Sequence, residues 1–148
     1  MFRGRYFHTV DPKGRLSIPS KFREVLANRY DDTNGLIVAN FDHCLVAYPE
    51  EEWARLEEKL VQLPSTQLEV RALRRLFFSS GVDCPPDKQG RILLPLESRR
   101  SVGITKNVLL AGAVNYFEIW SRERWDEYSA SNANFFETMS DKLANLGI

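Results

Sequence analysis

Alternation of polar and apolar residues predicts a short strand near the start of the chain. Residues 15–18 (Arg-Leu-Ser-Ile) alternate strictly, which is the period of a strand with one buried face. Residues 6–10 are predicted to form a strand that enters a turn, and residues 15–18 return from that turn to complete a hairpin. Pro19 ends the second strand, and residues 20–28 are predicted to form a short helix.

Two longer apolar runs predict a second hairpin. Residues 36–40 and 44–48 are rich in apolar side chains and flank Phe41-Asp42-His43, which predicts two strands joined by a tight turn. Residues 31–35, which precede this hairpin, are predicted to be a loop because they are polar and end in glycine.

Apolar residues spaced three or four apart predict helices between residues 52 and 79. One such face is followed by Pro64, which ends the helix. The apolar residues of this face are Trp53, Leu56, Leu60 and Leu63. Thr66-Gln67-Leu68-Glu69 has the spacing of a capping box, which predicts the start of a second helix.

The C-terminal residues 122–146 also have helical spacing, with an interruption predicted within residues 129–134. This segment contains Trp125, Phe135 and Leu143, and it is therefore more apolar than a disordered tail. It is predicted to pack as a helix.

A large part of the pattern occurs twice. Residues 11–23 recur as residues 87–99, an offset of 76, with the Asp, Gly, Arg, Pro and final Arg identical. The second hairpin recurs as residues 108–111 and 116–120, at an offset of 72. The chain is therefore interpreted as a duplication. The predicted domains are two repeats at 5–51 and 80–123, a helical connector at 52–79 and a C-terminal helix at 124–148.

The repeated string Asp-x-x-Gly-Arg predicts a β-turn in each copy. Asp11 suits the first position of a type I turn, where its carboxylate can cap the backbone N–H groups that follow. Gly14 can adopt the positive φ that returns the chain to a strand. Arg15 then begins on the outward face, beside the turn. The equivalent residues of the second copy are Asp87, Gly90 and Arg91.

Composition fits a globular chain without a membrane segment. The 148 residues are 43% hydrophobic, which is enough to bury a core. No apolar run is long enough to span a bilayer and the first residues lack the apolar block of a signal peptide, so a cytoplasmic location is expected. Cys44 and Cys84 have no CxxC spacing and are expected to be buried and reduced, with a metal or redox role as the alternative.

Charge is segregated along the chain although the formal net charge is zero. Residues 1–23 contain six basic residues and one acidic residue, a net charge of +5, whereas residues 50–58 contain five glutamates and one arginine, a net charge of −4. The basic segment coincides with the repeated motif. This distribution favours a nucleic-acid surface in spite of the balanced total.

The two motif arginines are the candidates for base contacts. An outward guanidinium of Arg15 or Arg91 could donate two hydrogen bonds to a guanine edge or to a phosphate. The alternative is an ion pair with the aspartate four residues earlier, Asp11 or Asp87, that only closes the turn. The further cations predicted to attract phosphate are Arg5, Lys13, Lys21, Arg23, Lys88, Arg99 and Arg100.

The second copy differs from the first in charge. Gln89 occupies the position of Lys13, and Glu97 occupies the position of Lys21. These differences predict weaker phosphate contacts for the second copy, or a role mainly in completing the fold.

The sequence gives little support to an enzyme. His8 and His43 have no partner at metal-ligand spacing, and Ser79-Ser80-Gly81 does not match a nucleophile elbow. No catalytic residue, metal, cofactor or small-molecule substrate is therefore predicted.

The duplicated Asp-x-x-Gly-Arg motif, followed each time by an apolar strand, Pro and Arg, resembles the MraZ family of bacterial transcriptional regulators. The two halves of these proteins are similar to the AbrB (SpoVT) DNA-binding domain. The resemblance extends over essentially the whole chain, and includes Met1-Phe2-Arg3-Gly4, residues 46–49 (Val-Ala-Tyr-Pro) and residues 117–120 (Phe-Glu-Ile-Trp).

This resemblance implies an α+β fold in which tandem AbrB-like half-domains, of the swapped-hairpin or double-split β-barrel type, form an intrachain pseudo-dimer with flanking helices. It also implies a homo-oligomer, in the form of a ring, that binds repeated sites in double-stranded DNA. Those sites lie upstream of the division and cell-wall gene cluster and include the protein's own promoter, where the family usually acts as a repressor. A nucleoid-associated protein of the cytoplasm is expected.

An alternative function is a protein-interaction module of the same fold. Antitoxins of related fold bind a partner protein through a terminal segment, and such a module would lack promoter-specific binding.

Overall fold

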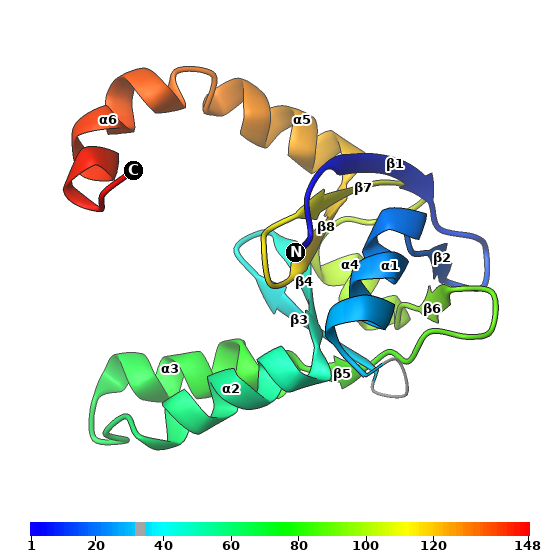
Figure 1. Ribbon diagram of the computed structural model, residues 1–148, viewed down its shortest axis with the longest axis horizontal. Helices are drawn as coiled ribbons and strands as arrows, with labels where there is room; N and C mark the ends of the chain where they lie inside the picture. Colours follow the sequence, from blue (N-terminus) through cyan, green and yellow to red (C-terminus); the bar gives the residue numbers. More distant parts are fainter. Residues whose placement is uncertain (32–34) are drawn as a thin grey trace.

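In the computed structural model, which describes residues 1–31 and 35–148, the strands form two antiparallel sheets (Figure 1). The larger sheet has six strands in the order β1 (Arg5–Thr9), β7 (Asn107–Gly112), β8 (Phe117–Ser121), β4 (Cys44–Pro49), β3 (Leu36–Phe41) and β5 (Val82–Asp83). The smaller sheet consists of β2 (Arg15–Ser17) and β6 (Arg91–Leu93). Of the predicted loop at 31–35, residues 32–34 lie outside the described residues.

The helices divide into two groups. Each three-residue strand of the smaller sheet is followed by a helix of the body, α1 (Ser20–Arg29) or α4 (Leu96–Ser101). The others form two arms that project from the body on the side away from β2 and β6 (Figure 1). One arm consists of α2 (Glu50–Val61), α3 (Leu68–Leu76) and the short 3-10 helix η1 (Phe78–Ser80), and the other consists of α5 (Arg122–Ser131) and α6 (Phe135–Asn145).

The two repeats exchange strands. β1 of the first repeat pairs with β7 of the second, and β5 of the second repeat pairs with β3 of the first. The hairpins β3–β4 and β7–β8 meet through the β4–β8 pair at the centre of the sheet. The predicted α+β class and the tandem repeat are therefore confirmed, and the repeats interlace in space.

The pairing predicted for the strand after the first turn is wrong. Residues 6–10 and 15–18 were expected to form one hairpin, but only Val10 and Leu16 form a bridge between them. β2 instead pairs with β6 of the other repeat, with Leu16 opposite Ile92. Because both side chains are buried, the pairing removes one apolar face of each strand from water.

The six-stranded sheet is covered on both faces. Phe117 and Ile119 of β8 belong to the main core, where the Phe22 ring lies 4.9 Å from the Phe117 ring, while Trp120 faces a second core beneath the arms. The side chains of β4 also alternate between the two cores, and residues 44–47 are all buried. Burial on both faces explains why these strands are apolar runs rather than alternating ones.

The second hairpin is confirmed, and its turn has the expected tight geometry. Asp42 and His43 have φ values of +51° and +76°, the two left-handed residues of a two-residue hairpin turn. Cys44 and Cys84 are buried and form no disulfide, as expected. Burial raises the pKa of the Cys84 thiol to about 11, and burial with the nearby Glu118 carboxylate raises that of Cys44 further.

The predicted capping box is wrong. Helix α3 begins at Leu68, and its N-cap is Gln67 with no side-chain hydrogen bond. The helix starts one residue later than the box requires, so Glu69 is its second residue instead of its third. The guanidinium of Arg71 instead donates to the carbonyl oxygens of Ser65 and Thr66, at 3.1 and 2.8 Å, and closes the loop before the helix.

The C-terminal segment is helical and interrupted as predicted, but its second helix does not pack on the body. Trp125 of α5 contacts Trp120, with ring centroids 5.5 Å apart. Helix α6 has no buried residue, and the Phe136 side chain is 77% exposed. Apolar composition indicated a helix correctly, but it could not indicate whether the covering surface lies in the same chain.

The interlaced strand pair β2–β6 makes Leu16 a sensitive position. Leu16→Ala should lower the free energy of unfolding by about 2–5 kcal/mol, because a fully buried side chain is removed between the two repeats. Leu68→Ala, at a residue that is 64% exposed, should change it by less than about 0.5 kcal/mol. Chemical denaturation measures both, and equal effects would contradict the described core.

Candidate nucleic-acid interface

The turn of the first repeat is built around the side chain of Asp11. The Gly14 N–H donates to the Asp11 carbonyl at 2.9 Å, and the Asp11 N–H donates to the Arg15 carbonyl at 3.0 Å. The Oδ1 atom of Asp11 accepts the backbone N–H groups of Lys13 and Arg15, at 2.9 and 2.8 Å. Gly14 has a φ of +90°, which a residue with a side chain rarely adopts. The predicted turn and cap are confirmed.

The second repeat forms the same turn from a different sequence. The Gly90 N–H donates to the Asp87 carbonyl at 3.0 Å, and Asp87 Oδ1 accepts the N–H groups of Gln89 and Arg91 at 2.9 Å each. Gly90 has a φ of +73°. Lys88 stands where the first repeat has a proline, so the aspartate and glycine are sufficient for this turn.

Each motif arginine forms an ion pair with its aspartate. Arg15 Nε lies 2.6 Å from Asp11 Oδ2, and Arg91 Nε lies 3.0 Å from Asp87 Oδ2. The ion pair between each arginine and the aspartate four residues earlier, which the sequence offered as the alternative to base contact, is therefore present. It occupies one of the five N–H donors of each guanidinium. The Arg15 and Arg91 side chains remain 36% and 30% exposed, so the ion pair fixes their orientation without burying them.

The hydrogen bonds at the turns favour ionised carboxylates. The backbone N–H of Arg15 is the main cause that lowers the pKa of Asp11 below its ordinary value of 3.8, and the Arg15 side chain acts in the same direction. The backbone N–H of Arg91 is likewise the main cause of the lowered pKa of Asp87. Both aspartates therefore hold their arginines over the whole physiological pH range.

The two turns meet at the small sheet. In the β2–β6 pair Arg15 lies opposite Leu93, and Ser17 lies opposite Arg91. Because cross-strand partners and alternate residues share a face, these four residues form one outer face, and the buried Leu16 and Ile92 form the other. We call β2 and β6 the arginine ribbon.

The outer face of the arginine ribbon is accessible, since Leu93 is 60% exposed and Ser17 is exposed. Sequence reasoning placed an arginine at each turn but missed that Ser17 and Leu93 lie between them. The strict alternation of residues 15–18 and 91–94 was the signal that could have identified these two neighbours.

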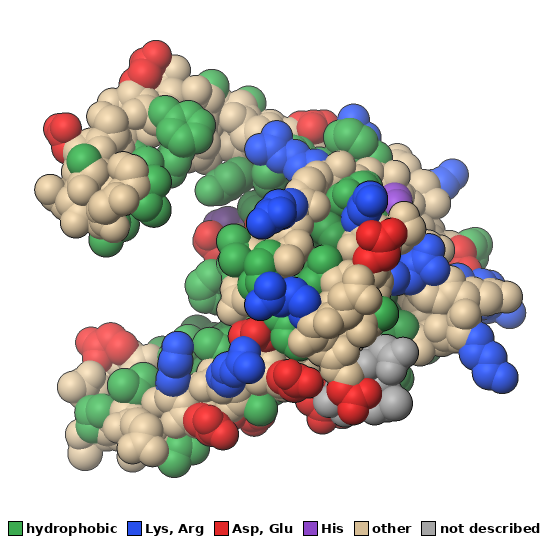
Figure 2. Space-filling view, in the orientation of Figure 1, with side chains coloured by type: hydrophobic (Ala, Val, Ile, Leu, Met, Phe, Trp, Pro, Cys, Tyr) green, Lys and Arg blue, Asp and Glu red, His purple; other side chains and the backbone are tan. Residues whose placement is uncertain are grey.

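The other predicted cations have different surroundings. Lys13 and Lys88 are exposed at the two turns, and Lys21 and Arg100 are exposed on α1 and α4. Lysine and arginine side chains extend from the end of the molecule that carries the turns (Figure 2). Arg5 is not brought to that end. It begins β1, about 13 Å of strand before the turn, and its guanidinium lies 5.0 Å from the ring centroid of Trp125.

Arg23 and Arg99 are directed toward the backbone. Arg23 Nε donates to the Ile18 carbonyl at 3.2 Å, and Arg99 Nε donates to the Leu94 carbonyl at 3.0 Å. Their positions are equivalent in the two repeats, at the offset of 76.

The histidines lie apart from each other and show no shared chemistry. His8 Nδ1 is 2.7 Å from the Ser17 carbonyl oxygen, and His43 Nε2 is 3.9 Å from Asp42. Within residues 1–31 and 35–148, no three His, Cys, Asp or Glu side chains are placed to hold a metal ion. The same described ranges contain no helix with the length and apolar content needed to cross a bilayer.

The fold and the ribbon define a class of protein in which two repeats of one chain interlace and present a pair of arginine turns on one small sheet. The family model described as "MraZ protein, putative antitoxin-like" matches this chain twice, at residues 1–76 and 77–145. The chain belongs to the MraZ family.

Relatives named "Transcriptional regulator MraZ" are similar over the whole length. The protein of Desulfitobacterium hafniense (strain Y51) is 47% identical over 148 residues, and that of Heliobacterium modesticaldum is 46% identical, with 100% of each chain covered. The protein of Moorella thermoacetica is 43% identical with the same coverage.

The lowered pKa values of Asp11 and Asp87 predict a pH dependence of stability. Because each folded-state pKa lies below the unfolded value, the stabilisation is complete above about pH 4 and is lost as the pH falls through the folded-state pKa. Asp11→Asn and Asp87→Asn keep an oxygen acceptor but remove the charge. Their melting temperatures should be below that of the unmodified protein at pH 6, and the difference should shrink below pH 4.

Asp141→Asn, at an exposed position of α6, is the control for this titration. It should follow the unmodified protein at every pH in thermal unfolding followed by circular dichroism. A constant difference between the Asp11 or Asp87 variants and the unmodified protein from pH 6 to pH 2.5 would show that the charge is irrelevant.

Proposed function

We propose that this protein is a sequence-specific DNA-binding transcriptional regulator that inserts its arginine ribbon into a major groove. The observation that carries the proposal is the shared outer face of β2 and β6, with Arg15 and Arg91 on it. A two-stranded antiparallel ribbon has the width that the major groove of B-DNA admits, and arginine is the side chain that pairs with the O6 and N7 atoms of guanine. The transcriptional-regulator names of relatives that are 43–47% identical support the same function.

The ion pairs with Asp11 and Asp87 would assist base contact. Each carboxylate engages the Nε side of the guanidinium, which leaves the edge formed by the two terminal nitrogens to face a guanine. A side chain that is already oriented loses less conformational freedom on binding than a free one. In this arrangement the turn-closing contact and the base contact are two parts of one mechanism.

The exposed cations around the ribbon would supply sequence-independent affinity. Lys13 and Lys88 lie at the turns, and Lys21 and Arg100 lie on the helices that follow the ribbon strands. Contacts from these residues to phosphates would release counterions and make binding strongly salt-dependent. The proposed targets are repeated sites upstream of the division and cell-wall gene cluster, including the protein's own promoter, with repression as the usual outcome. We also propose that the two repeats form an AbrB-like pseudo-dimer of the swapped-hairpin type. The protein would be cytoplasmic and associated with the nucleoid.

Removal of one ribbon arginine should weaken specific binding. Arg15→Ala and Arg91→Ala should each lower affinity for a duplex of the protein's own promoter by about 5- to 150-fold, since a bidentate guanine contact contributes about 1–3 kcal/mol. Arg55→Ala, on the α2 arm, is the control and should bind like the unmodified protein. Fluorescence anisotropy measures the affinities, and light scattering shows whether the assembly survives.

The same two variants separate the regulator from the protein-interaction module. Genome-wide chromatin immunoprecipitation of the unmodified protein should recover defined promoters, and both arginine variants should lose them. A protein that recovers no promoter, but retains one stable protein partner in both variants, would support the module and refute the regulator.

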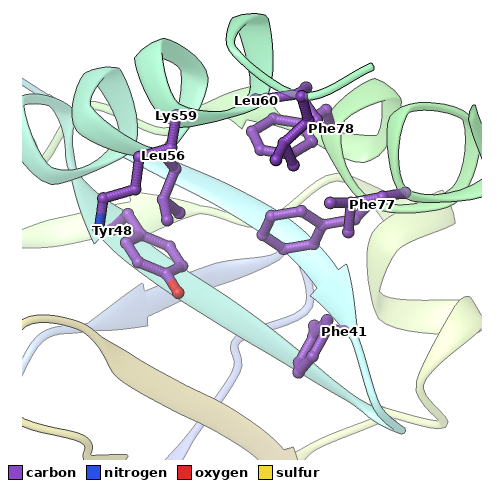
Figure 3. A pocket seen from close by; sticks show the side chains of 9 residues that line it. Phe41, Tyr48, Leu56, Lys59, Leu60, Phe77 and Phe78 are labelled. Atoms are coloured by element: carbon purple, nitrogen blue, oxygen red, sulfur yellow. The ribbon is translucent and has the colours of Figure 1, made fainter. Parts of the chain in front are cut away.

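We also propose that the protein assembles as a ring through its two arms. The α2–α3 arm and strands β3 and β4 enclose an apolar hollow of about 210 Å³ (Figure 3). Its lining includes Phe41, Tyr48, Leu56, Leu60, Phe77 and Phe78. Helix α6 of the other arm carries exposed or half-exposed apolar side chains at helical spacing, which are Phe135, Phe136, Met139 and Leu143.

The hollow and α6 are complementary surfaces on different parts of one chain. An interface in which α6 of each copy enters the hollow of the next copy is heterologous, and it gives a ring when the rotation between copies closes. Charge is compatible with this arrangement, because Lys59 lines the hollow and α6, which carries Glu137, Asp141 and Lys142, has a net charge of −1. A ring would present many ribbons to consecutive sites and so raise the effective concentration of weak contacts.

A charge on α6 should disrupt the assembly. Phe136→Asp places a carboxylate at a side chain that is 77% exposed in the single chain, so the fold of the chain should be preserved. Size-exclusion chromatography with light scattering should show smaller species than for the unmodified protein. Ile148→Asp, at a residue that is 87% exposed and outside α6, is the matched control and should leave the assembly intact. An unchanged mass for Phe136→Asp would exclude α6 from the interface.

A further inference from the structure

The backbones of the two turns are joined across the repeats. The Ile18 N–H donates to the Gly90 carbonyl, and the Leu94 N–H donates to the Gly14 carbonyl, both at 2.9 Å. Each turn glycine is thus bonded to the residue that directly follows the ribbon strand of the other repeat. The carbonyl oxygens of those two residues are the acceptors of Arg23 and Arg99.

Arg99 lies directly over the turn of the first repeat. A Cβ atom built on Gly14 would be 2.8 Å from Nη2 of Arg99 and 2.9 Å from the Leu94 carbonyl oxygen. The guanidinium therefore fills the space that a side chain at position 14 would need. Arg99 Nε donates to the Leu94 carbonyl, and the Leu94 N–H donates to the Gly14 carbonyl. Leu94 therefore links the arginine to the backbone of the turn glycine.

The second half repeats this arrangement in reverse. A Cβ atom built on Gly90 would be 2.5 Å from Cδ, 3.0 Å from Nε and 3.1 Å from Nη1 of Arg23. Arg23 belongs to the first repeat and Gly90 to the second. The contact thus occurs twice, each time from one repeat to the turn of the other. We call Arg23 and Arg99 the cross-repeat arginines.

We propose that the cross-repeat arginines are positioning residues for DNA recognition, each of which holds the turn of the opposite repeat so that Arg15 and Arg91 reach the same groove. The inference rests on the proposed function of the arginine ribbon. It changes the role predicted from sequence, since both residues had been grouped with the cations that attract phosphate.

The chemistry requires arginine. The contact needs an Nε–H donor within the side chain and a flat group that can lie against a glycine backbone, and lysine has neither. The neighbouring residue in α4 has a different environment: Arg100 is exposed, whereas Arg99 is half-buried and bonded to a carbonyl. These adjacent residues allow a direct comparison, in which Arg99 represents an arginine that positions a turn and Arg100 represents one that attracts phosphate.

The test compares lysine and alanine substitutions at positions 99 and 100. The probes are a duplex that the unmodified protein selects from a random-sequence pool and a scrambled duplex of the same composition. Arg99→Lys keeps the charge, yet it should lower the ratio of selected to scrambled affinity by at least about tenfold and leave the salt slope unchanged. Arg100→Ala should weaken binding to both duplexes and reduce the salt slope by about 0.9, and Arg100→Lys should behave like the unmodified protein.

Hydrogen–deuterium exchange of the DNA-free protein provides a second measurement. In Arg99→Lys, exchange should accelerate in residues 11–15, the turn of the other repeat, and stay unchanged in residues 87–91. Arg23→Lys should give the opposite pattern. The Leu94 N–H, which donates to Gly14, belongs to the link itself and should also exchange faster in Arg99→Lys. Acceleration in the turn of the substituted residue's own repeat, with none in the turn of the other repeat, would overturn the proposal.

The outcomes separate this inference from the proposed function. If Arg99→Lys keeps the affinity ratio, and Arg99→Ala reduces the salt slope as Arg100→Ala does, then Arg99 is a phosphate contact and the positioning role is refuted. If the unmodified protein selects no duplex at all, the regulator proposal fails, whereas the exchange pattern still decides whether the cross-repeat arginines hold the opposite turns. Lysine variants that unfold are replaced by Arg23→Gln and Arg99→Gln in the same exchange measurement.

Discussion

The reciprocal backbone hydrogen bonds between the turns are the constraint on which the structure depends. They run from Ile18 to Gly90 and from Leu94 to Gly14, and they extend the β2–β6 pair at both of its ends. This pair buries Leu16 with Ile92 and turns both motif arginines to the opposite face. A three-residue strand has too few hydrogen bonds to be stable alone. The ribbon exists because the two repeats contribute to one core, and the outer face is therefore a product of the duplication.

The duplication has preserved the scaffold and varied the surface. The aspartates, glycines and arginines that make the turns and the cross-repeat contacts are the same in both repeats, as are Pro19 and Pro95. The differences in charge occur where side chains are exposed, for example at Gln89 and Glu97, which replace Lys13 and Lys21. The two halves therefore share one geometry but differ in charge, which would let a pseudo-symmetric ribbon bind DNA in a preferred orientation.

Local features could be predicted from the sequence, and long-range ones could not. The turn at Asp11 was predictable because its hydrogen bonds lie within five residues. The exchange of strand partners between the repeats was not predictable, because alternation shows which face of a strand is buried and never which strand lies beside it. For the same reason Arg99 was grouped with Arg100, although only one of them is held by a carbonyl. The apolar side chains of α6 were correctly predicted to be helical, but periodicity gives no information about whether their partner belongs to the same chain.

The two arms show how one duplication can produce unlike surfaces. Each arm begins with a helix after the second hairpin of its repeat, at Glu50 and at Arg122. In the first arm the chain folds back, so that Val70 and Phe77 are buried and the hollow forms between helix and sheet. In the second arm the chain continues outward into α6, which has no buried residue. The hollow and the uncovered helix are unlike surfaces, so in the proposed ring one arm would be the donor and the other the acceptor. Every added copy would then leave one surface of each kind free until the last copy met the first.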